Sequence, residues 1–574
     1  MHHLTAALTR GWVLFGFGAL ASALAVAQLG VLGQQQPGID SIIYQEVAEQ
    51  IAKVGYSEAL SSHWSPLYPL YLCAINNLSG LGVEHEPIIS SLGYAALLLL
   101  GCGVAGMFLH GVANLLWPRG TGERLEARAW ICYGLGLTLY LLFAVHKVSM
   151  RMPDGLVFCL AIAALGCWCR AFTKGLSWRW TFAAGIFSGL GFLARSNVLH
   201  WSGVVAIMAC GLAPNVSFRR RPTAFVAWFL GLLIFVTPQI WMMTARKGSL
   251  EFGNTGRMTF AQVYGVSWPE GPATWPLRLA DGDVRVFTER RMVNFPGFYD
   301  MDRAYENAKL AIGVSTVLRA FIQAVFSFLL GYWSPGHALL WPLLWATWPL
   351  WLMGLGSWRM EGQNENGDPP GFSALRRRMA YLLTCAGLVG IGMHLLSSCY
   401  FHYLPAYLFA LLVGACLWML EGSKDKLSTV HACRACYGVA LGFALVTSLT
   451  TIALFRDVNT RGIKSTIAQT NRLVSAFNEL PAPKDGLRRI AVLGEGWLDL
   501  YAIRLSASQI YADIPDPLVF SDESRFNRVI EALRQEKVVA VLATVAPCTN
   551  RTRENWRHIE GTNWWLLNLD APAG

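Results

Sequence analysis

Hydrophobic positions along this 574-residue chain gather in long runs, separated by short loops that carry most of the basic residues. A run of about twenty apolar residues is long enough to cross a bilayer as a helix. The pattern predicts eleven such helices, at 12–32, 88–116, 128–146, 155–172, 180–195, 198–213, 223–243, 337–356, 379–397, 403–420 and 436–455. Two other apolar segments, 67–78 and 313–332, are expected to lie along the membrane surface, because counting either alone as a span would misplace later basic loops.

The distribution of charge predicts the topology. Positively charged loops stay in the cytoplasm, and Arg10 precedes the first span, which predicts a cytoplasmic N-terminus and an outer loop at 34–87. An odd number of spans then leaves the C-terminus outside. The first span is interpreted as a retained signal anchor, because it is long and is followed by glutamines rather than a cleavage site. The net charge of +10 therefore reflects loop topology and does not indicate nucleic acid as a partner.

Composition agrees with a membrane protein, since 54% of residues are hydrophobic and 14% are charged. The composition changes near residue 456. From there the pattern predicts a strand at RRIAVLG, a capped amphipathic helix from Ser521 and a strand from Lys537. The predicted fold is thus a polytopic α-helical domain over 1–455, followed by a small extracytoplasmic α/β domain over 456–574.

The segment after the first span carries the first candidate chemistry. A helix over 41–54 has an apolar face and a polar face at helical spacing, and such a helix is expected to lie on the outer leaflet. Its apolar face holds Ile43, Val47, Ile51 and Val54, and its polar face holds Gln45, Glu46, Glu49 and Lys53. Asp40 stands at its start, where a carboxylate serves as an N-cap and, being fixed, is also well oriented as a general base.

Further ionisable groups gather where later helices are predicted to end outside. They are His146, Lys147, Arg151 and Asp154; Arg195 with Asn197; Arg246, Lys247 and Arg257; and His402 with Tyr403. Each has a structural interpretation, since Asp154 suits an N-cap and Lys147 or Arg195 can extend toward the interface. Taken together, these carboxylates, cations and aromatic groups beside lipid favour a phosphate-bearing lipid as substrate.

The outer loop resembles that of the GT-C membrane glycosyltransferases. The resemblance lies in Asp40 soon after the first span, Tyr44 and Ala48 on the helix, and HWSPLYPLYL from His63 to Leu72. The match is nearest to the branch of protein O-mannosyltransferases and lipid A aminoarabinose transferases. It continues in MPDGL at Met152 to Leu156, in GFLARSN ending at Asn197 and in HYLPAYL at His402 to Leu408. It covers about residues 10 to 455.

The resemblance implies an enzyme that transfers a sugar from a polyprenyl-phosphate donor to a lipid, glycan or protein acceptor, with inversion, on the outer side of a bacterial inner membrane. By this analogy Asp40 is the general base, and Asp154 orients the acceptor or helps to bind a divalent metal. Arg151, Arg195 and Arg257 neutralise the lipid phosphate. His402 and Tyr403 line the donor side, and Tyr44, Glu46 and His63 belong to the same substrate-binding set. No cofactor follows with certainty from the resemblance.

The chain departs from the family pattern at two positions, with Ser41 at a second acidic position and His402 where related chains often carry Arg. The acceptor and the need for a metal therefore stay open. A transporter or lipid flippase is the alternative function, and it would show a path across the membrane. An enzyme would instead bring Asp40, Asp154 and a basic residue together at one site.

Overall fold

The computed structural model describes most, but not all, of the chain. The described residues are 39–116 (without 60 and 62), 153–250 (without 215 and 249), 277–287, 293–295, 372–395, 404–422, 461–481, 486–493, 500–544 and 556–569, together with 134, 138, 266–267, 309–310, 315, 318–319 and 321–322. Arg151, Arg257, His402 and Tyr403 lie outside these residues.

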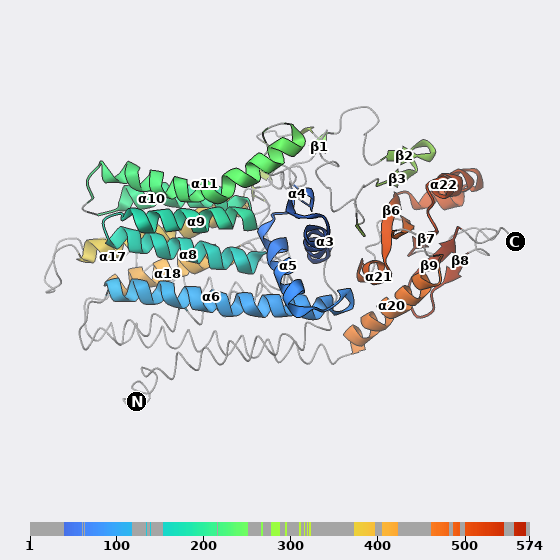
Figure 1. The fold of residues 1–574 in the computed structure, drawn as a ribbon, viewed down its shortest axis with the longest axis horizontal. Helices are drawn as coiled ribbons and strands as arrows, with labels where there is room; N and C mark the ends of the chain where they lie inside the picture. The colour runs from blue at the N-terminus through green and yellow to red at the C-terminus, as the bar shows by residue number, and fades with distance from the viewer. Residues whose placement is uncertain are drawn as a thin grey trace.

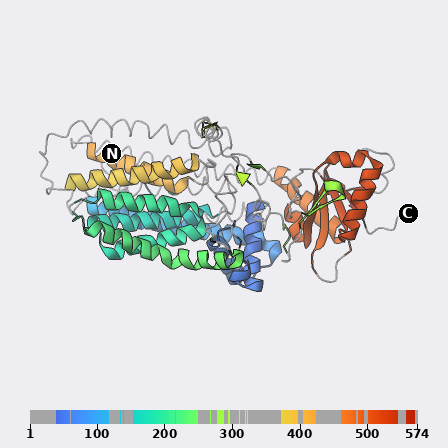
Figure 2. The same ribbon diagram turned by 90° about the horizontal axis from the view of Figure 1, so that it is seen from above.

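Long helices form a bundle at one end of the molecule, and a mixed sheet lies at the other (Figures 1 and 2). The bundle helices are α6 (Glu86–Leu116), α8 (Asp154–Thr173), α9 (Trp178–Ala194), α10 (Asn197–Leu212), α11 (Arg220–Lys247), α17 (Phe372–Leu395) and α18 (Pro405–Gly422). Each overlaps a predicted span. The other four spans fall almost entirely outside the described residues, so the number eleven stays a prediction.

Within the described residues, three helices are long and apolar enough to cross a membrane: Leu92–Val112, Asp154–Thr173 and Arg220–Arg246. The first and third also expose large apolar side chains, among them Met107 on α6 and Trp241 on α11. Large exposed apolar surface on long apolar helices suits contact with lipid rather than water.

Helix α8 is the centre of the bundle, with most of its side chains buried, including Phe158 and Trp168. Beside it, α9 and α11 approach each other closely through glycines. A Cβ atom added at Gly185 would lie 2.0 Å from the Trp228 carbonyl oxygen, and one added at Gly231 would lie 2.3 Å from the Phe182 carbonyl oxygen. Small residues at helix contacts in a membrane allow this close backbone approach, which supplies van der Waals packing.

Three shorter helices lie between the bundle and the sheet (Figure 1): α3 (Ile39–Val54), α4 (Tyr56–Ala59) and α5 (Leu67–Ser79). Helix α5 coincides with the apolar segment predicted at 67–78, and it runs across the end of the bundle. Helix α3 differs from the leaflet-bound helix that its two-faced pattern predicts. Gln45 and Glu46 on its polar face are buried, as Ile43 on its apolar face is. Gln45 accepts a hydrogen bond from Asn76 of α5, and Glu46 meets Asn294 and Arg504.

The sheet has seven strands, in the order β2-β3-β6-β5-β7-β9-β8. Strands β5, β6 and β7 are parallel, and the remaining pairs are antiparallel. The strands are β2 (Leu277–Leu279), β3 (Val284–Val286), β5 (Arg488–Leu493), β6 (Ser508–Ile514), β7 (Ala540–Ala543), β8 (Trp556–His558) and β9 (Trp565–Asn568). Strands β5 and β7 lie at the two segments where strands are predicted. Strands β2 and β3 come from the segment between the predicted spans 223–243 and 337–356, so the sheet extends beyond the predicted domain of 456–574.

Helices cover both faces of this sheet. Side chains alternate across a strand, so Ile490 and Val492 of β5 join the core that includes α20 (Arg461–Asn478) and α21 (Leu500–Leu505), whereas Ala491 and Leu493 pack on the face of α22 (Glu523–Gln535). Helix α22 is capped by the Asp522 carboxylate, which accepts hydrogen bonds from the Ser524 and Arg525 amides. The result is a three-layer α/β domain.

The close glycine contact in the bundle can be tested by Gly185→Ala. The added methyl group would meet the Trp228 carbonyl oxygen of α11, and this backbone atom cannot rotate away, so α9 and α11 would have to separate. We expect a loss of about 1–3 kcal/mol of stability, measured by thermal unfolding in detergent. The control is Gly211→Ala on α10, where an added Cβ meets nothing within 4 Å. Equal stability of the two variants would contradict the packing.

Candidate functional site

An ion pair joins the adjoining ends of α8 and α9. The two helices run in opposite directions and are connected by the short segment 174–177, so the start of α8 and the end of α9 lie together. Arg195, the residue after α9, donates from Nη1 to Oδ1 of Asp154, the first residue of α8. The Asp154 side chain is 3% exposed and the Arg195 side chain 18% exposed. Asp154 Oδ2 has no hydrogen-bond partner among the described residues.

Asp40 belongs to the same electrostatic cluster. It lies in the first turn of α3, which begins at Ile39, and its carboxylate interacts with both the Arg195 guanidinium and the Asp154 carboxylate. Burial raises the pKa of the Asp40 carboxyl above its ordinary value, and the neighbouring Arg195 opposes that rise. The base predicted from the sequence is thus a desolvated carboxyl beside a cation.

Aromatic rings of α3 and of the segment that follows it pack against one another. Tyr44 of α3 meets Trp64 edge to face at 4.9 Å and Tyr68 at 5.2 Å, both between ring centroids. His63 meets Trp64 in the same manner at 4.6 Å. Burial, followed by the positive charge of Arg195, lowers the pKa of His63 to about 4. His63 is therefore a neutral imidazole at physiological pH, able to exchange hydrogen bonds with a substrate without adding charge.

Two residues of the site were not selected from the sequence, His394 of α17 and Tyr407 of α18. The buried His394 Nε2 lies 2.8 Å from Asn197 Nδ2, and its ring lies 5.4 Å from the Tyr407 ring. Asn197 follows Arg195 by two residues, so both rings lie at the same end of the bundle as the pair of Arg195 with Asp154. The sequence does hold a signal for His394, because it is an ionisable residue inside an apolar helix, and such residues mark functional sites by default.

Of the predicted site residues that the structure describes, Asp40, Tyr44, His63, Asp154 and Arg195 come together. Glu46 does not. Its Oε1 accepts a hydrogen bond of 2.6 Å from the Asn294 amide and lies 3.9 Å from Arg504 Nη1 of the sheet domain. Asp154 was also interpreted as an N-cap, but the N-cap position of α8 is Pro153, and the Asp154 carboxylate instead accepts from Arg195.

The part of the chain that the structure describes contains no set of side chains that could bind a metal ion. No group of three or more His, Cys, Asp or Glu side chains there could hold a metal ion. Asp154, the residue that the resemblance offers as a ligand, is paired with Arg195. We therefore derive no metal-dependent step from these residues.

The arrangement combines a carboxylate base with a guanidinium in a region of low polarity. Arg195 presents planar donors that match a phosphate, and low polarity strengthens its attraction for developing negative charge. Asp40 can accept a proton from a hydroxyl group bound beside it. The described residues can thus assist a displacement in which a hydroxyl group loses its proton and a phosphate leaves.

Comparisons with known proteins give similarity in structure but none in sequence. No protein-family model matches the chain, and no curated protein matches it. The crystal structure of ArnT from Cupriavidus metallidurans bound to undecaprenyl phosphate is similar to it, with a TM-score of 0.45, 15% sequence identity and 98% of each chain covered. ArnT is a GT-C aminoarabinose transferase, and the motifs of the outer loop resemble those of the same branch. At this identity and TM-score, the likeness gives no ground for transferring its ligand to this chain.

The ion pair between Asp154 and Arg195 can be measured by a double-mutant cycle. Asp154→Asn leaves the Arg195 guanidinium without its main partner in a mostly buried site, so we expect a loss of about 3 kcal/mol of stability. Adding Arg195→Gln should recover part of this loss, because the unpaired charge is removed as well. Thermal unfolding of the two single variants and the double variant in detergent gives the coupling energy. Strict additivity of the two losses would contradict the pairing.

Proposed function

We propose that the chain is a membrane glycosyltransferase that moves a sugar from a polyprenyl-phosphate donor to an acceptor hydroxyl group, with inversion, on the extracytoplasmic side of a bacterial inner membrane. The observation that carries the proposal is the buried ion pair of Arg195 with Asp154 at the end of the bundle, with Asp40 of α3 within electrostatic range of the same guanidinium. The GT-C-like motifs of the outer loop support it, because they contain Asp40, Tyr44 and His63 of this cluster.

In this reaction Asp40 removes the proton of the acceptor hydroxyl as its oxygen attacks the anomeric carbon. The bond between that carbon and the phosphate oxygen breaks, and its electron pair leaves with the polyprenyl phosphate. A single displacement of this kind inverts the configuration and needs one base. Arg195 stabilises the charge on the leaving phosphate, and Asp154 holds the guanidinium in place. The burial of Asp40 limits the access of water to the base.

The alternative, a transporter or lipid flippase, needs polar groups along a path through the membrane. The charged residues that come together here instead occupy adjoining helix ends: Asp154 begins α8, Arg195 follows α9, and Asp40 begins α3. This convergence of two carboxylates with one cation favours the enzyme.

Removing the base tests the proposal most directly. Asp40→Asn keeps the shape of the side chain but cannot accept the proton, so we expect the rate of transfer to fall by about 10²- to 10⁴-fold while donor binding is kept. The assay reconstitutes the protein in vesicles of bacterial lipid extract with a labelled polyprenyl-phosphate sugar and follows release of polyprenyl phosphate. Asp281→Asn, at an aspartate whose side chain is 83% exposed, is the matched control. Transfer at the normal rate by Asp40→Asn would exclude Asp40 as the base.

The pH dependence of transfer gives a second test. Asp40 must be ionised to act as a base, so activity is present above its pKa and is lost as pH falls through it. Because burial raises this pKa, the loss should occur at a higher pH than for an exposed aspartate. Arg195→Gln removes the cation that opposes the rise, so its acid limb should move to still higher pH. Arg528→Gln, at an exposed arginine, is the control. An unchanged acid limb in Arg195→Gln would contradict the electrostatic coupling.

A further inference from the structure

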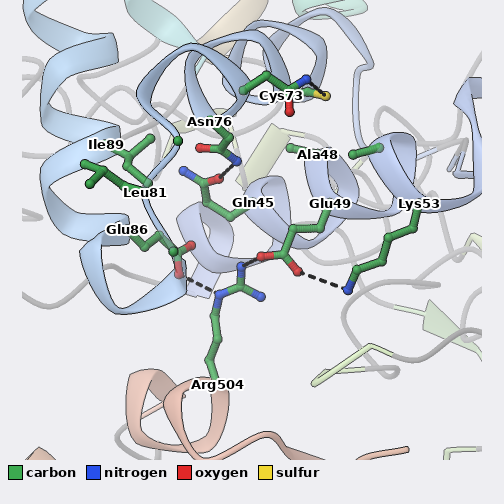
Figure 3. A pocket seen from close by; sticks show the side chains of 14 residues that line it. Gln45, Ala48, Glu49, Lys53, Cys73, Asn76, Leu81, Glu86, Ile89 and Arg504 are labelled. Atoms are coloured by element: carbon green, nitrogen blue, oxygen red, sulfur yellow. Dashed lines mark hydrogen bonds and ion pairs between the residues drawn. The ribbon is translucent and has the colours of Figure 1, made fainter.

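Arg504 of α21 in the sheet domain is buried among carboxylates of the outer loop and the bundle. Its side chain is 3% exposed. Its Nε donates to Glu86 Oε2 at 2.6 Å, and its Nη2 donates to Glu49 Oε1 (Figure 3). Nη1 lies 3.9 Å from Glu46 Oε1. Arg504, Glu46, Glu49 and Glu86 are called the Arg504 cluster below.

The charges of this cluster are unequal, because three carboxyl groups surround one guanidinium. Burial raises the pKa of Glu46 to about 8, although Arg504 and the Asn294 amide act in the opposite direction. Without Arg504 the three carboxyl groups would share a poorly hydrated space with no charged partner in the cluster, and they would repel one another when ionised. Arg504 is therefore the group that allows α3 and the start of α6 to meet the sheet domain here.

The Arg504 cluster is a polar contact beside the apolar core that α3 and α21 share. A cavity of 420 Å³ lies beside Arg504 (Figure 3). It is lined in part by Ala48 and Ala52 of α3 and by Gly80 and Gly82, which follow α5. Small side chains and an open cavity give little van der Waals contact. Contact between α3 and the sheet domain at this point thus depends on polar groups.

Asp40 is on the same helix as Glu46 and Glu49. They follow it by six and nine residues, which corresponds to about 9 and 14 Å along a helix axis. The first turn of this helix therefore places Asp40 within electrostatic range of Arg195 of the bundle, and its middle meets Arg504 of the sheet domain. A shift of α3 at one contact changes the other.

Resting on the proposed function, we propose that Arg504 is a positioning residue for the general base. By pairing with Glu46, Glu49 and Glu86, it holds α3 so that Asp40 faces Arg195. The sheet domain then sets the transfer rate although it supplies no group that contacts the reacting atoms.

Hydrogen exchange tests the positioning without any substrate. In Arg504→Met we expect the amides of Ile39–Val54 to exchange about tenfold faster, while those of the central helix α8 keep their rates. Arg504→Lys, which keeps the charge but loses the planar fork, should give an intermediate increase. Arg557→Met is the matched control, because Arg557 pairs with Glu479 on the exposed surface of the same domain. Unchanged exchange of α3 in Arg504→Met would overturn the proposal.

Kinetics distinguish positioning from a general loss of folded protein. Misplacing a base slows the chemical step, so kcat of Arg504→Met should fall at least tenfold while the donor KM changes less than about threefold. Arg504→Lys should recover part of kcat, and Arg557→Met should match the unmodified protein. A normal kcat in Arg504→Met would overturn the proposal.

If Arg504→Met does not fold, Glu49→Gln gives the same information more mildly, because it removes one partner and leaves Glu46 and Glu86 with Arg504. Faster exchange of α3 with a lower kcat would support the positioning role, and no change in either would overturn it. Absence of transfer by the unmodified protein would instead count against the proposed function, while the exchange result would still decide the role of Arg504.

Discussion

A buried guanidinium must be neutralised, and this requirement governs the surroundings of α3 on two sides. At the end of the bundle, Arg195 pairs with Asp154 and is near the carboxyl group of Asp40. At the sheet domain, Arg504 lies against three glutamates. Charges in such places are costly unless they are paired, so each arginine restricts where its partners can lie. Because α3 carries carboxyl groups near both arginines, charge restricts its position in addition to apolar packing.

The same requirement gives the site its chemistry. A carboxylate in water is a weak base, and one that is buried alone would be protonated and could not accept a proton. Asp40 lies between these limits, because burial raises its pKa and Arg195 opposes the rise. The neutral His63 adds hydrogen-bonding capacity without disturbing this balance of charge.

Much of the bundle and half of the site follow from the sequence, because both depend on local patterns. Apolar runs locate the helices, and the side on which they end selects Asp40, Asp154 and Arg195 as neighbours. The sequence does not predict that Glu46 points to the sheet domain. Its partner Arg504 lies more than four hundred residues later, and a two-faced helix pattern does not reveal such a distant contact. Strands β2 and β3 of three residues each are too short for period-two alternation to be recognised, and their place in the sheet depends on pairing with β6.

Asn294 explains why the sheet domain cannot be regarded as an independent attachment. Its amide donates to Glu46 of α3, its Nδ2 donates to the Ser508 carbonyl oxygen of β6, and its Oδ1 lies 3.4 Å from Arg504 Nη1. One residue from the segment between the predicted spans thus contacts the helix that carries Asp40, the sheet and the arginine that joins them. Since β3 of the same segment also pairs with β6, the edge of the sheet is completed by a loop of the membrane domain. A displacement of the sheet would consequently be transmitted to α3 through hydrogen bonds as well as through charge, and the two domains are better understood as one unit built around that helix.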